Sequence, residues 1–68
     1  MTEIIFHVEE APEGGFTARA IGQSIFTEAD TLEALRPAVI DAVRCHFEPG
    51  TCPALVRLHI VRDEILAA

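Results

Sequence analysis

Acidic side chains near the N-terminus are the first residues of this sequence that could do chemistry. Glu9, Glu10 and Glu13 lie close together in the chain, and Asp30 follows further along. Carboxylates hold the two Mg²⁺ ions of phosphoryl-transfer enzymes, but only where they project together into one cleft. The three glutamates instead surround a turn that contains proline and glycine, and Asp30 precedes an apolar helical pattern. We interpret all four as solvated turn and cap residues, and expect no nuclease activity.

Cysteine and histidine residues offer a second possible site. Cys45, His46 and Cys52, together with His7 and His59, could in principle bind zinc. Zinc ligands usually come in pairs two to four residues apart, whereas six residues separate the two cysteines. Adjacent residues on a helix point about 100° apart, so Cys45 and His46 do not form a nucleophile–base pair. We therefore interpret Cys45 as a small buried residue and Cys52 as a loop residue, and expect no metal, no cofactor and no catalytic residue.

Composition limits the classes of partner. The chain has 68 residues, a mass of 7.4 kDa and a net charge of −6, from 11 acidic residues and 5 basic ones. Acidic chains repel phosphate backbones, so we expect no direct DNA binding, while a basic protein partner would be attracted. Half of the residues are hydrophobic, which is rich for so short a chain. We therefore expect a single domain over 1–68 that buries part of its apolar surface in a homodimer.

The N-terminal residues predict where the protein resides. Met1-Thr2-Glu3-Ile4 has no basic segment before an apolar stretch, so it does not resemble a signal peptide. No apolar run approaches the roughly 20 residues that span a bilayer. We expect a cytoplasmic protein with no membrane contact.

Hydrophobic periodicity predicts the order β-β-β-α-β. Alternating apolar residues predict strands at 3–10, 16–21, 24–27 and 55–62, and the segment 11–15 has the proline and glycines of a hairpin turn. Asp30 or Thr31 can cap a helix, with Glu33 reaching back from its first turn. Apolar residues at three- and four-residue spacing then continue to about Phe47. Pro37 lies inside this pattern and predicts a kink or a tight first turn.

These elements predict an α+β fold, a two-layer sandwich with one helix packed on an antiparallel sheet. The sheet face away from the helix would be too apolar for water alone, and we expect a partner to bind there. The residues that we assign to this partner-binding face are Ile5, His7, Arg19, Ile25, Arg57 and His59. If the first and last strands are neighbours, His7 and His59 lie close together. They would then be either half-exposed strand residues without a role or part of a pH-sensitive interface.

The sequence resembles the HicB antitoxin family over nearly its whole length in element order. The matching residues are Glu9, Glu10, Gly14, Gly15, Phe16 and Ala18, and then Asp30, Thr31, Leu32, Glu33 and Ala34. The resemblance implies a truncated ribonuclease-H-like fold and binding of a small basic RNA-cleaving toxin, HicA. Many members also carry a C-terminal DNA-binding module, and no segment of this sequence corresponds to it. The chain also has Ile21-Gly22-Gln23-Ser24 where the family often has a Pro-Gly-Cys-like turn.

Two functions follow as hypotheses. The first is a HicB-like protein-binding module, an antitoxin-type partner of a small basic protein, without enzymatic activity. The alternative is an orphan structural or ligand-binding domain that has no toxin partner and no catalytic activity.

Overall fold

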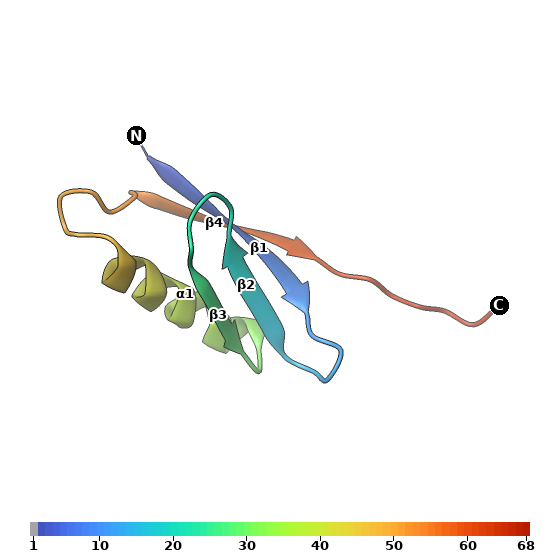
Figure 1. The fold of residues 1–68 in the computed structure, drawn as a ribbon. Helices are drawn as coiled ribbons and strands as arrows, with labels where there is room; N and C mark the ends of the chain where they lie inside the picture. The colour runs from blue at the N-terminus through green and yellow to red at the C-terminus, as the bar shows by residue number, and fades with distance from the viewer. Residues whose placement is uncertain (1) are drawn as a thin grey trace.

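One four-stranded sheet with a helix on one of its faces makes up the fold. The computed structural model describes residues 2–68. Along the chain it contains β1 (Glu3–Glu10), β2 (Phe16–Ala20), β3 (Phe26–Ala29), α1 (Leu32–His46) and β4 (Leu55–Val61). Figure 1 shows α1 lying on one side of the sheet. The predicted order of elements and the α+β fold with a helix packed on a sheet are confirmed.

The sheet is mixed rather than antiparallel throughout. Its strand order is β3-β2-β1-β4, in which β1 pairs with β2 and β2 with β3 in antiparallel fashion. β4 pairs with β1 in parallel. The reason is that α1 carries the chain back along the sheet before β4 begins, and a helix crossover of this kind brings parallel strands together. The expectation of an antiparallel sheet was therefore wrong for β4.

The hairpin between β1 and β2 forms as the sequence predicts. The amide of Ala11 donates to the carbonyl of Gly15 at 2.9 Å, and the amide of Gly14 donates to the carbonyl of Ala11 at 3.0 Å. Gly14 and Gly15 have φ values of 100° and 83°, a region that residues with a Cβ rarely occupy. A Cβ on Gly15 would also lie 3.0 Å from the carbonyl oxygen of Ala29. Gly15 therefore fixes both the turn and its close approach to the end of β3.

The third strand begins two residues later than predicted. β3 covers Phe26–Ala29, whereas the sequence pattern indicated 24–27. Phe26 pairs with Arg19, which places Ile25 level with Ala20. Opposite residues of an antiparallel pair point to the same face, and Ala20 is buried beneath the helix, as is Ile25. The predicted assignment of Ile25 to the outer face was therefore wrong.

Thr31, one of the two predicted caps, starts α1. Its Oγ1 accepts a hydrogen bond from the amide of Ala34 at 3.1 Å. Glu33 then stands at the second helical position, where its charge complements the helix dipole. The helix continues through Pro37 without interruption and ends with Phe47 as the C-terminal cap.

The core lies between α1 and the sheet. Its buried residues are Ile4, Phe6, Val8, Ala18, Ala20, Ile25, Leu35, Val39 and Val43. The helix contributes its predicted apolar stripe, but α1 packs mainly against β2 and β3. Between α1 and the start of β4 there remains a hollow of about 230 Å³, lined in part by Ile40, Val43 and Val56. The helix therefore leaves the side of β4 that faces it incompletely covered.

Candidate partner-binding surface

The outer face of the sheet, which points away from α1, is open and has an ordered arrangement of side chains. The strand registers align His59 of β4, His7 of β1, Arg19 of β2 and Phe26 of β3 in one row across all four strands. We call these four residues the central row. Arg19, Phe26 and His59 are exposed and His7 is half-buried. The row places two imidazoles, a guanidinium and a phenyl ring on neighbouring strands of the outer face.

Phe26 is the residue of this face that the sequence analysis missed. Its exposed fraction of 62% is high for an aromatic residue within a strand. It occupies the outer position that we had assigned to its neighbour Ile25. The adjacent pair of apolar residues in 24–27 gave no indication of which one points outward, because that depends on the pairing of β3 with Arg19 on β2.

His7 and His59 do lie close together, as predicted for neighbouring strands. Their ring centroids are 6.1 Å apart and the rings are tilted by 39°. The Nε2 atom of His7 lies 2.7 Å from the Oε1 atom of Glu9, which is next on the same face of β1. Glu9 thus orients the His7 ring, while the exposed His59 ring is free to contact another molecule.

Arg57 and Ile5 stand beside the central row. Arg57 donates a hydrogen bond from Nη2 to the Oε2 atom of Glu3 at 3.0 Å. This hydrogen bond, and then the charge of Glu3, raise the pKa of Arg57. Ile5 pairs with Arg57 across the two strands and is half-buried. Five of the six residues predicted for the partner-binding face therefore lie on it together, and Ile25 does not.

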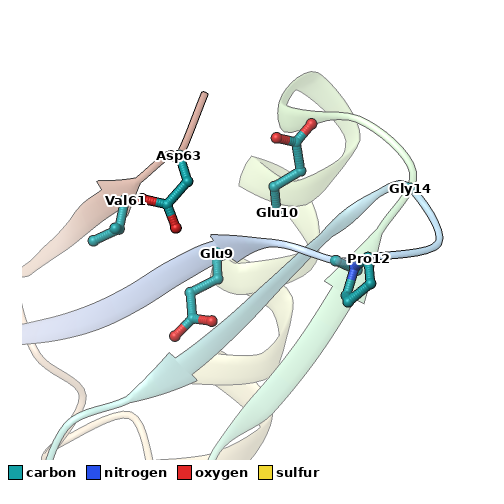
Figure 2. Close-up of a pocket in the computed structure, with 7 residues that line it drawn as sticks. Glu9, Glu10, Pro12, Gly14, Val61 and Asp63 are labelled. Carbon is teal, nitrogen blue, oxygen red and sulfur yellow. The ribbon is translucent and has the colours of Figure 1, made fainter. Parts of the chain in front are cut away.

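Carboxylates gather at the end of the sheet that carries the β1–β2 hairpin. A hollow of about 560 Å³ is lined there by Glu9, Glu10 and Asp63, among others. Figure 2 shows Glu9 and Glu10 pointing to opposite sides of β1, as successive strand residues must. An adjoining hollow of about 410 Å³ is lined by Glu13, Glu28 and Asp30, among others. We call Glu9, Glu10, Glu13, Glu28 and Asp30 the acidic end.

The carboxylates of the acidic end are all exposed to solvent. Within residues 2–68, no three His, Cys, Asp or Glu side chains are grouped so as to hold a metal ion. The carboxylates of Glu9 and Glu10 diverge, so the two do not share a ligand site. The negative charge of the acidic end can attract cationic groups.

Two relatives place the chain among known proteins. It is 58% identical over 52 residues to a UPF0150 protein of Archaeoglobus fulgidus, and this match covers 76% of the chain and 77% of the relative. It is 40% identical over 65 residues to a UPF0150 protein of Thermotoga maritima, which covers 96% of the chain and 91% of the relative. The chain belongs to the UPF0150 family. No family model matches this UPF0150 chain, and no solved structure matches it.

Two further features of the UPF0150 chain concern its thiols and its helix. Cys45 is exposed and Cys52 is half-buried, and both are free thiols. The prediction that Cys45 is buried was wrong, because it lies two residues after the buried Val43 and so on the other side of α1. In the region 2–68, no helix is both long enough and apolar enough to cross a membrane.

Proposed function

We propose that this UPF0150 chain is a HicB-like protein-binding module of the cytoplasm. Its partner is a small basic protein of the HicA toxin type, and the module itself carries no enzymatic activity and does not bind DNA directly. The observation that carries the proposal is the open outer face with the central row at its middle. The resemblance to the HicB family supplies the class of partner.

The central row has the composition of a binding surface. Tryptophan, tyrosine and arginine side chains dominate the binding energy at protein interfaces, and phenylalanine is enriched there as well. Phe26 and Arg19 stand opposite each other on adjacent strands, and both are exposed. The exposed phenyl ring of Phe26, at one end of this row, offers a partner a hydrophobic anchor.

The acidic end adds long-range attraction for a basic partner. Five carboxylates lie on the strands and turns that border the outer face, and the whole chain has a net charge of −6. Charge complementarity of this kind accelerates association, and this acceleration decreases as salt is added. The same charge disfavours the phosphate backbone of a nucleic acid.

The alternative function is an orphan structural or ligand-binding domain that has no toxin partner. Within residues 2–68 the hollows at the acidic end are open and lined by charged side chains. Small-molecule sites are mostly enclosed and apolar with a few polar groups. This observation supports the protein-binding proposal over a ligand-binding one.

A growth-rescue experiment tests the proposal. The small basic reading frame nearest to the gene is induced in a bacterial host, alone and together with this chain. We expect the basic protein to arrest growth and the chain to restore it. Rescue should be lost with the triple variant Glu13→Gln, Glu28→Gln, Asp30→Asn and kept with the matched helix and loop variant Glu33→Gln, Asp41→Asn, Glu48→Gln. A host with no small basic frame near the gene, or equal rescue by both variants, contradicts the proposal.

A further inference from the structure

β4 is the edge of the sheet, and its outer side has a row of unused backbone groups. It is the last strand in the order β3-β2-β1-β4. The amide of Leu55 donates to the carbonyl of Thr2 at 3.2 Å, so Leu55 and every second residue after it bond to β1. Val56, Leu58 and Ile60 therefore direct their amides and carbonyls outward. Such an edge is a template for another strand unless it is blocked.

Several side chains along this edge are apolar and exposed, as on a surface that another chain covers. Leu55, Ile60 and Val61 are 47%, 43% and 38% exposed. Proline, which natural proteins use to blunt open edges, is absent from Leu55–Val61, and the arginine of this strand, Arg57, is bonded to Glu3 on β1. The helix does not cover this side either, and the hollow of about 230 Å³ lies beside the start of the strand.

The residues after β4 carry further exposed apolar surface. Figure 1 shows this segment continuing beyond β4 and away from the other elements. Ile65 and Leu66 within it are 95% and 81% exposed. Two large aliphatic side chains in water at the end of an extended segment cost solvation free energy that burial against a partner would recover.

We infer that a second copy of this chain pairs with β4 in antiparallel orientation, about a two-fold axis at Ile60. Opposite residues of such a pair point to the same face, so registers differ in steps of two residues. With the axis at Ile60, Arg57 lies opposite the partner's Asp63, and Leu55 lies opposite the partner's Ile65. One step either way instead places Arg57 opposite Val61 or Ile65 of the partner, so that no carboxylate of the partner lies directly opposite it. Charge complementarity selects the register at Ile60.

The same register brings Leu66 to the open hollow. It places the partner's Leu66 opposite Ala54, and Ala54 lines the hollow together with Ile40 and Val56. Arg57 is 64% exposed at its side chain and bonds to Glu3, so its remaining N–H groups can donate to a second carboxylate, from the partner. Paired segments of this length exchange about ten backbone hydrogen bonds. The dimer thus pairs the exposed apolar residues of β4 and its extension with apolar or imidazole side chains of the partner, and leaves His7, Arg19 and Phe26 of the central row uncovered.

Reversing one charge of the pair tests both the dimer and its register. The native chain should sediment at twice its 7.4 kDa mass. Arg57→Asp and Asp63→Arg each place like charges opposite one another at both ends of the symmetric interface, and each should weaken dimerisation about tenfold. An equimolar mixture of the two variants should recover native affinity as a heterodimer, because each contact then joins an arginine with an aspartate.

The controls separate this dimer from misfolding and from the proposed function. Circular dichroism establishes that each variant is folded, and Arg36→Asp on the exposed side of α1 should dimerise as the native chain does. A native chain that sediments as a monomer at 100 μM overturns the inference, as does a mixture no tighter than its components. Growth rescue is a separate measurement that uses Phe26→Ser, because Phe26 lies on the edge strand opposite β4 and outside the dimer interface; Arg57 and His59 belong to both surfaces and are not used for it.

Discussion

Replacing Ile25 by alanine should destabilise the protein strongly, because this residue belongs to the core. Ile25 is 6% exposed, whereas Ile21, four residues earlier on the same connection, is 60% exposed. Ile→Ala removes three carbon atoms, which at about 0.8 kcal/mol each gives roughly 2.4 kcal/mol of transfer free energy. The neighbouring loop can relax into part of the cavity, so we expect a total of about 3 kcal/mol, in the lower part of the range for such substitutions. Ile21→Ala should cost less than about 0.5 kcal/mol.

Urea denaturation followed by circular dichroism measures this difference. For a chain of this size an m value of about 1 kcal/mol/M converts the loss into a midpoint shift of about 3 M. A loss of about 3 kcal/mol is a large part of the total free energy of unfolding, which is about 3–10 kcal/mol for this chain at about 0.05–0.15 kcal/mol per residue. Both variants are compared at one protein concentration, since dimerisation would make the midpoint concentration-dependent. Equal, small shifts for Ile25→Ala and Ile21→Ala would refute the placement of Ile25 under the helix.

Three further substitutions test the turn, the helix cap and the outer face. In the same urea assay, Gly15→Ala should lower the free energy of unfolding by about 2–3 kcal/mol, because the positive φ and the contact with the Ala29 carbonyl act together. Gly14→Ala should lower it by about 1 kcal/mol, because a Cβ at Gly14 meets no neighbour. Thr31→Ala should lower the unfolding free energy by about 1 kcal/mol through loss of the hydrogen bond to the Ala34 amide, and Thr31→Ser should retain most of it. Phe26→Ser should leave the thermal midpoint of unfolding within a few degrees of the native value, because the ring is largely in water. The same substitution should reduce the binding of an apolar dye. A large decrease in the thermal midpoint would show that Phe26 supports the core instead.

Local signals in the sequence predict most of this fold. The β1–β2 hairpin depends on Gly14 and Gly15, whose backbone angles other residues seldom adopt. The helix follows from a cap at Thr31 and an apolar stripe that repeats every three or four residues. Each of these signals acts within a few residues, so one sequence is enough to read it.

Non-local pairing limits what the sequence predicts. Ile25 and Phe26 are adjacent in the sequence and both are apolar. Only the pairing of β3 with β2 determines which of them is buried. The parallel direction of β4 depends on where α1 returns the chain, a tertiary property with no local signature. The exposure of Cys45 could have been predicted from the sequence, because its spacing from Val43 places it on the side of α1 opposite the apolar stripe.

The candidate site was partly predictable for the same reason. Alternation along β1, β2 and β4 places Ile5, His7, Arg19, Arg57 and His59 on one face, and the structure brings these five residues together. The acidic end could not be predicted as a unit, because Glu28 and Asp30 reach the hairpin only through the pairing of β3 with β2.

Direct binding between this chain and a small basic protein tests the central claim most closely. The chain is immobilised, exposed to native-host lysate at low and at high salt, and the retained proteins are identified and then titrated in purified form. The account predicts that one small basic protein binds, that salt weakens it, and that Phe26→Ser weakens it at least about tenfold while Ile21→Ser does not. Retention of no basic protein, or equal binding by the Phe26 and Ile21 variants, would contradict the account.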